Sequence, residues 1–332
     1  MRRSRYGGGA KGSRGSQFYQ ENNPPYGATF TYFLRDGYET LRKKRRDNER
    51  ENLKAGKDNP YPTWDALRAE DREEAPALVL IIRDSSGAIV REMTGPAEKG
   101  LHRVAWDMRY PATSPVSLKP PGFKPPWWEP PVGPLALPGT YTVELAKRIN
   151  GKLTGLTDPK SFALKPMERA SPLETDDRAA LLAFQRKTAE LQRAVEGAVK
   201  ALGELNGRVE HVKRAIDSTP AIEESFRDRL RTVEGQLHDL SVVLTGDRTI
   251  RRRNEPSPWS IESRVGSIVY GHWHSLAAPT GTHTAAYDIA ATEFERALRQ
   301  LRRIDTYLGA LEGQIEQNGA PWTPGRLPSW SR

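Results

Sequence analysis

Residues 181–216 read LLAFQRKTAELQRAVEGAVKALGELNGRVEHVKRAI, and this stretch decides half of the fold. Its apolar residues recur at alternating spacings of three and four, which is typical of a long helix that packs along one face. The members of this stripe are Leu181, Phe184, Thr188, Leu191, Val195, Ala198, Leu202, Leu205, Val209, Val212 and Ile216. The sequence therefore predicts a coiled-coil-like helix that reaches roughly 60 Å.

Three further amphipathic segments follow with the same helical spacing, and Pro220 and Gly246 supply breaks between them. The segments lie at 222–244, 261–276 and 287–315. Because short connections place consecutive helices as antiparallel neighbours, we expect residues 175–317 to form an elongated antiparallel bundle of three to four helices. Residues 318–332 are expected to form an extended tail.

The preceding part of the chain has a different pattern, with short β-type runs separated by turn residues. The expected strands lie at 27–34, 77–83, 88–93, 101–106, 140–147 and around 162–164. This pattern predicts an antiparallel β-sandwich over residues 26–168, with a charged insertion at 35–75 and a proline-rich loop at 115–138. The insertion ends in a short helix that Thr63 caps. Residues 1–25 are Gly- and Arg-rich and are expected to form a flexible arm.

The fold class is therefore multidomain, all-β followed by all-α. The loop at 115–138 holds nine prolines, so it is expected to be stiff and extended. Two interpretations of this loop remain: it docks a partner through Trp127 and Trp128, or it crosses and packs against its own chain.

Charge is unevenly distributed along the chain, which has 51 basic and 42 acidic residues and a net charge of +9. The first 14 residues carry five basic residues and no acidic one, and a second basic cluster follows much later. That second cluster consists of Arg248, Arg251, Arg252 and Arg253. The run Arg42–Arg46 lies in the insertion 35–75, where eleven basic residues are balanced by eleven acidic ones. Because a nucleic-acid site needs a basic face with little opposing charge, no nucleic-acid partner is predicted.

The chain has no cysteine, which excludes disulfides, thiolate metal sites and cysteine nucleophiles. It has no apolar run near the ~20 residues that span a bilayer, so no membrane segment is predicted. The basic N-terminal stretch is followed by no apolar segment, so no secretory signal peptide is predicted and the compartment stays open.

Chemistry-bearing motifs are sparse. His272 and His274 flank Trp273, and His283 follows, but residues two apart on a helix point to different faces, so no metal site is predicted. Carboxylates lie mostly in helices beside basic residues, and no nucleophile elbow, zinc-protease motif or dinucleotide fingerprint occurs. We therefore predict no catalytic, cofactor-binding or metal-binding residue, and favour a chain that is not an enzyme in its own right.

Two segments carry a resemblance. Gly100–Pro111 (GLHRVAWDMRYP) and Leu137–Leu145 (LPGTYTVEL) resemble an Ig-like module of the flagellar-hook-capping type, so the expected β-sandwich is Ig-like. In that pattern Pro138-Gly139 suits a type II turn with positive φ on the glycine. Trp106 and Tyr141 are the expected core aromatics.

The order of the whole chain resembles the C-terminal third of large bacterial proteins with BNR/Asp-box, sortilin-like β-propellers, often labelled glycosyl-hydrolase or sialidase-like. Asn23–Ala28 (NPPYGA), the Ig-like module and then a helical bundle with Ser275–Thr280 (SLAAPT) follow that order. The sequence has no Asp box and no blade repeat. The resemblance implies that any glycan-cleaving residues lie on the propeller, so none is carried over. It also implies an exported family, periplasmic or extracellular.

Two functions follow as expectations. The first is a non-catalytic C-terminal accessory or docking module for a β-propeller supplied by the same operon or a split gene, without cofactor. The second is a free-standing scaffold or adaptor that binds partners through its helical bundle and proline-rich loop. The predicted contact residues are Trp127, Trp128, Trp322 and Trp330, with self-association as a further outcome. The alternative that Trp322 and Trp330 fold back onto the chain's own core stays open.

Overall fold

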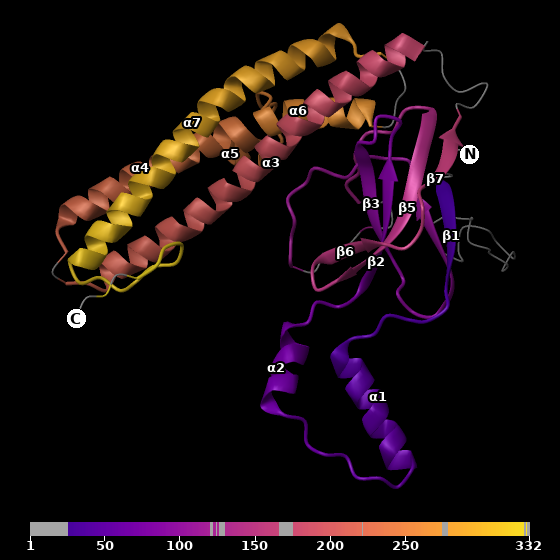
Figure 1. The fold of residues 1–332 in the computed structure, drawn as a ribbon. Coiled ribbons are helices and arrows are strands. Elements are labelled where there is room, and N and C mark those ends of the chain that lie inside the picture. The colour runs from indigo at the N-terminus through magenta and orange to yellow at the C-terminus, as the bar shows by residue number, and fades with distance from the viewer. Residues whose placement is uncertain are drawn as a thin grey trace, which may run out of the picture. The chain divides into compact units, whose positions relative to one another are not determined.

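The structure is a computed structural model, shown in Figure 1. It describes residues 26–119, 122, 123, 125, 130–165, 175–220, 222–273, 278–328 and 330. The predicted arm at 1–25 lies outside these residues. The described residues form seven strands in antiparallel sheets and seven helices, with no closed barrel among them.

The chain divides into two compact units. The first unit, here the strand unit, comprises the described residues within Met1–Pro111, Phe123–Pro130 and Leu135–Ala170. The second, here the helical unit, comprises those within Ala112–Gly122, Pro131–Pro134 and Ser171–Arg332. The described residues within 115–122 and 131–134 of the proline-rich loop therefore belong to the helical unit. Thr113, just before this loop, donates a hydrogen bond from its hydroxyl to Gln192 Oε1 on α3 (Thr175–Asp217) at 3.1 Å.

The strand unit contains two antiparallel sheets. Its strands are β1 (Ala28–Leu34), β2 (Ala77–Arg83), β3 (Ile89–Gly95), β4 (Gly100–Trp106), β5 (Gly139–Ile149), β6 (Lys152–Gly155) and β7 (Lys160–Leu164). β1 pairs with β4, while β3, β2 and β5 lie side by side and both β6 and β7 pair with β5. All six predicted strands are present, and β6 is an additional one.

An aromatic core joins side chains from both sheets. Trp106 of β4 is fully buried and lies edge-on to Tyr141 of β5, with ring centroids 5.6 Å apart. Phe30 of β1 meets Phe162 of β7 in the same way at 5.2 Å. The indole nitrogen of Trp106 donates to the carbonyl oxygen of Arg109 at 2.9 Å, so its polar atom is satisfied. The predicted core role of Trp106 and Tyr141 is confirmed.

The central strand β2 is buried on both faces. Ile82 packs with Trp106 and Tyr141, whereas Val79 and Ile81 form a second small cluster with Ala146. Because successive strand residues point to opposite faces, burial on both sides requires an unbroken apolar run. This explains why β2 reads ALVLIIR without polar alternation.

Glycine is required at one strand start and not at the predicted turn. Gly27 has φ +116°, and a Cβ there would lie 1.8 Å from the carbonyl oxygen of Trp106. Gly139 is not among the glycines with positive φ, and it is the first residue of β5. The predicted type II turn at Pro138-Gly139 is therefore wrong, because the pairing of Gly139 with Leu164 of β7 holds its backbone extended.

Between β1 and β2, the charged insertion forms α1 (Leu41–Lys54) and α2 (Trp64–Arg72). The predicted short helix capped by Thr63 is confirmed, since the Thr63 hydroxyl accepts a hydrogen bond from the amide of Ala66 at 3.2 Å. The Arg42–Arg46 run is helical and lies within α1.

The helical unit contains α3 (Thr175–Asp217), α4 (Glu224–Thr245), α5 (Arg248–Arg251), α6 (Ile261–His272) and α7 (Gly281–Gln317). α3, α4, α6 and α7 share one hydrophobic core. Every residue of the predicted stripe on α3 is buried except Phe184, which is partly exposed. Within the ranges given above, no helix combines the length and apolar composition that crossing a lipid bilayer would need.

One buried ion pair ties α3 to α7. The guanidinium of Arg208 donates to both carboxylate oxygens of Glu312, at 3.0 and 2.7 Å, and the Glu312 side chain is fully buried. Arg208 also pairs with Asp305 at 2.6 Å. The tail after α7 also packs against Arg208. The backbone at Gly325 lies so close to this side chain that a Cβ there would be 3.1 Å from Arg208 Cδ.

Candidate functional site

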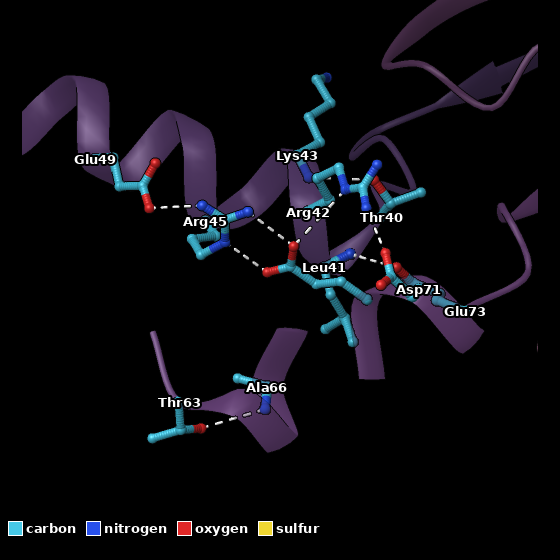
Figure 2. Close-up of polar contacts among 11 residues, drawn as sticks. Thr40, Leu41, Arg42, Lys43, Arg45, Glu49, Thr63, Ala66, Asp71 and Glu73 are labelled. Carbon is cyan, nitrogen blue, oxygen red and sulfur yellow. Dashed lines mark hydrogen bonds and ion pairs between the residues drawn. The ribbon is translucent and has the colours of Figure 1, made fainter. Parts of the chain in front are cut away.

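The segment from Thr40 to Glu73, which we call the helical hairpin, is fixed by polar contacts rather than by a core. The Thr40 hydroxyl accepts a hydrogen bond from the amide of Lys43 at 3.2 Å, which starts α1 (Figure 2). The carboxylate of Glu73, just after α2, accepts one from the amide of Leu41 at 2.6 Å. The end of the second helix thus caps the start of the first.

Arg45 is the centre of the ion pairs between α1 and α2. Its guanidinium donates to both carboxylate oxygens of Glu70 at 2.6 and 2.8 Å, and to Glu49 one turn along at 2.7 Å. Figure 2 shows this arrangement together with Arg42, which donates to Asp71 at 2.6 Å. Such two-pronged pairing fixes the orientation of both side chains and hence of the two helices.

The charge states of this network follow from its hydrogen bonds. Hydrogen bonds from Arg45 hold the pKa of Glu70 below its ordinary value, and Arg42 and Arg46 act in the same direction. Hydrogen bonds to Glu70, and then to Glu49, raise the pKa of Arg45. Both partners therefore stay ionised at neutral pH, and the Glu70 side chain is 5% exposed.

The residues that flank the hairpin are anchored to β5 and to two connections between strands of the same unit. The amide of Glu74 donates to Asn150 Oδ1 at 3.1 Å, and its carboxylate pairs with Arg148 at 3.1 Å. On the other side, the amide of Tyr38 donates to the carbonyl oxygen of Ala97 at 2.9 Å. The connecting loop is held by Asn59, whose amide donates to the carbonyl oxygen of Glu49 at 2.9 Å.

Neither helix of the hairpin contains a buried residue. Three large apolar side chains are displayed to solvent: Leu53 and Tyr61 are each 75% exposed and Trp64 is 67% exposed. The rings of Tyr61 and Trp64 lie edge-on with centroids 6.0 Å apart. The hairpin thus presents an aromatic pair at the start of α2, which we call the Tyr61/Trp64 pair.

The structure describes two of the four predicted contact tryptophans. Trp127 and Trp128 lie outside the described residues. Trp322 is 49% exposed and its indole nitrogen donates to the carbonyl oxygen of Arg326 at 3.1 Å, while Trp330 is 85% exposed. Their role in partner contact stays a prediction.

The histidines considered as ligands are partly brought together. Nε2 of His272 lies 2.8 Å from Nδ1 of His283, while His274 lies outside the described residues. Burial, and then the neighbouring His283, lowers the pKa of His272. No group of three histidine, aspartate or glutamate side chains in the described part of the chain is arranged to hold a metal ion.

The carboxylate of Glu262 on α6 has a raised pKa. The pKa of Glu262 is raised, first by burial and then by the nearby Glu196, and Arg251 opposes this. An acid–base pair for hydrolysis must flank a substrate pocket. Neither glutamate lines the hollows of the helical unit described below, so we assign this pair no chemistry.

Sequence reasoning missed the Tyr61/Trp64 pair. A signal was available, because both aromatic residues stand in a segment of balanced charge that lacks an apolar stripe. An aromatic residue without apolar neighbours at helical or strand spacing has no core of its own to enter.

Comparison of this chain with protein-family models, with curated proteins and with solved structures gave no match in any of the three.

Proposed function

We propose that this chain is a non-catalytic C-terminal docking module, and that its partner is the β-propeller of the glycosyl-hydrolase-like proteins whose C-terminal third this chain resembles. The observation that carries the proposal is the helical hairpin, whose two helices contain no buried apolar residue and which displays the Tyr61/Trp64 pair. Exposed aromatic groups that cluster on a surface are typical of contact surfaces.

The hairpin is suited to this role because its ion pairs are satisfied internally. Arg45 is paired with both Glu49 and Glu70, so a docking partner does not have to supply a counter-charge for this arginine. The apolar groups Leu53, Tyr61 and Trp64 are left as the unsatisfied part of the surface. Burying them against a partner would remove large apolar areas from water.

We further propose that the strand unit is an Ig-like β-sandwich and the helical unit an elongated antiparallel bundle. The aromatic core shared by the two sheets supports the first, and the continuous core of α3, α4, α6 and α7 supports the second. In this proposal each unit is a folded support that holds a contact surface in place for a partner to bind.

The test is retention of the propeller protein encoded beside this chain. The variant Tyr61→Ala/Trp64→Ala should reduce retention on an affinity column at least tenfold. Tyr270→Ala is the matched control, because Tyr270 is 78% exposed and lies in the helical unit. Equal retention of all three forms would overturn the proposal, as would glycoside hydrolysis by the isolated chain that disappears on a single carboxylate substitution.

The second candidate function is a free-standing scaffold that binds partners through the helical unit. The exposed Trp330 and the half-exposed Trp322 of the tail favour it. Under this alternative, Trp322→Ala/Trp330→Ala would weaken partner binding while the hairpin variant would leave it unchanged.

A further inference from the structure

The helical unit carries a basic hollow between α4 and α7, far in sequence from the hairpin. The hollow has a volume of about 770 Å³, and its lining includes Thr232, Gln236, Arg296, Arg299, Gln300 and Arg303. The three arginines recur on α7 at spacings of three and four, so they stand in a row along one face of the helix. Tyr307 lies one turn beyond Arg303 and also lines the hollow. Its hydroxyl accepts a hydrogen bond from Arg229 at 2.9 Å.

The charge of this hollow is uncompensated. No carboxylate is among its lining residues. Within the described part of the chain, Arg296 and Arg303 make no ion pair, and Arg299 reaches Glu295 at 4.0 Å, the limit for an ion pair. This contrasts with the hairpin, where Arg42 and Arg45 are paired with carboxylates at 2.6–2.8 Å. The groups offered here are guanidinium, amide and hydroxyl donors, which match an acceptor-rich, anionic ligand.

A second hollow, of about 520 Å³, continues the first toward α5. The two share Arg296 and Gln300, so they form one groove, here the α4–α7 groove. The second part is lined by Val243, Ile250 and Trp259, with Trp259 57% exposed. Two acids also line it: Asp247, which caps α5, and Glu293. The groove therefore has one basic end and one end, here the apolar end, where apolar side chains lie together with two acids.

We propose that the α4–α7 groove binds an acidic amphipathic helix of a partner protein. The groove runs along α7 from Glu293 to Tyr307, about 21 Å at helical rise, which matches a partner helix of roughly 14 residues. Acidic side chains four residues apart on that helix would meet the arginine row, and one large apolar side chain would meet Trp259 and Val243. This inference concerns a different surface from the hairpin, so either can fail without the other.

The apolar end favours a peptide over a nucleic acid. A phosphate polymer would satisfy Arg296, Arg299 and Arg303, but it would bring the acids Asp247 and Glu293 against phosphates. An amphipathic helix satisfies both ends, because it carries acidic and apolar side chains at fixed spacing.

The experiment uses the full chain and three labelled probes in fluorescence anisotropy at ~150 mM salt. The first probe is a 14-residue helical peptide with one apolar turn followed by glutamates four residues apart. The second is a scrambled peptide of the same composition, and the third is a single-stranded oligothymidine of similar length. We expect the first peptide to bind at least tenfold more tightly than the other two.

Two variants locate the binding. Arg296→Gln/Arg299→Gln/Arg303→Gln should weaken binding of the first peptide roughly tenfold or more, because three charge-assisted contacts are lost. The matched control removes the same charge elsewhere through Arg214→Gln/Arg231→Gln/Arg302→Gln, whose arginines are exposed and do not line the groove. It should change binding less than twofold. A Trp259→Ala variant should weaken the designed peptide and leave the scrambled one unchanged.

Three results would overturn the proposal. Equal binding of designed and scrambled peptides would show general charge attraction, tighter binding of the oligothymidine would assign the groove to nucleic acid, and equal loss in both triple variants would place the site elsewhere. Circular dichroism melts of all variants establish that each is folded before binding is compared.

Discussion

The Arg208–Glu312 pair gives the sharpest prediction about stability. Glu312 on α7 is fully buried, and its two carboxylate oxygens accept hydrogen bonds from Arg208 on α3 at 3.0 and 2.7 Å. The substitution Arg208→Ala removes this partner and leaves a carboxylate inside the helical unit. It also removes the side chain against which Gly325 of the tail packs.

The expected loss follows from the burial of the stranded charge. Removing one partner of a buried ion pair costs about 3–5 kcal/mol, because the other charge stays desolvated. For a unit of this size, 1 kcal/mol shifts the melting temperature by about 2–4 °C, so the helical unit should melt roughly 6–20 °C lower. The double variant Arg208→Met/Glu312→Leu replaces both charges by apolar groups and should recover most of the loss.

The assay is differential scanning calorimetry of the full chain, read on the transition of the helical unit. Asp305→Ala is the control, because Asp305 pairs with Arg208 but is 59% exposed, and its loss should cost less than about 1 kcal/mol. The reasoning is refuted if Arg208→Ala lowers the transition no more than Asp305→Ala does. It is also refuted if the double variant is as unstable as the single one.

The remaining predictions concern the titration of His272 and the substitution of two glycines, Gly27 and Gly197. His272 has a lowered pKa in the folded chain, so below its ordinary value of about 6.5 the unfolded chain binds more protons, and the stability of the helical unit should fall as pH drops through this range. Urea unfolding at several pH values should show a flatter dependence for His272→Gln and no change for His211→Gln, which is exposed. Gly27→Ala should destabilise the strand unit by at least ~2 kcal/mol, because its Cβ would collide with a backbone carbonyl 1.8 Å away. Gly197→Ala on α3, where a Cβ meets nothing within 4 Å, should instead stabilise by about 1 kcal/mol, and thermal melts compare the two.

The sequence predicted those elements whose pattern is local. The stripe on α3 was predictable because a helix that packs along its length buries a residue every three or four positions. Every residue of the stripe except Phe184 is buried. The run of β2 was predictable because burial on both faces leaves no polar residue from Ala77 to Ile82. β6 could not, because all four of its residues are exposed and it is defined by its pairing with β5.

The contacts that decide the candidate surfaces are not local. Arg45 and Glu70 are 25 positions apart, and Arg208 and Glu312 are 104 apart, so their pairing depends on how the elements come together. The insertion 35–75, with eleven charges of each sign, allows many alternative pairings of equal plausibility. Sequence reasoning could identify it as a charged helix or loop and could not select the pairing that orients the hairpin.

Because the hairpin is held by polar contacts and not by an apolar core, a partner that binds it should change its local stability. Helices of 14 and 9 residues are marginal in isolation, and α1 and α2 contain no buried apolar residue that would stabilise them. Of the ion pairs between the two helices, Arg42–Asp71 is exposed and Arg45–Glu70 is only partly buried. Local opening of the hairpin should therefore cost far less free energy than opening of β2 or α3, whose apolar side chains are buried. We therefore expect backbone amides of α1 and α2 to exchange with deuterium faster than those of α3, α4 and α7 in the free chain. They should become protected when the docking partner buries the Tyr61/Trp64 pair, and the Tyr61→Ala/Trp64→Ala variant should abolish that protection while leaving exchange in α3 unchanged. Slow exchange of α1 and α2 in the free chain, equal to that of α3, would contradict this argument.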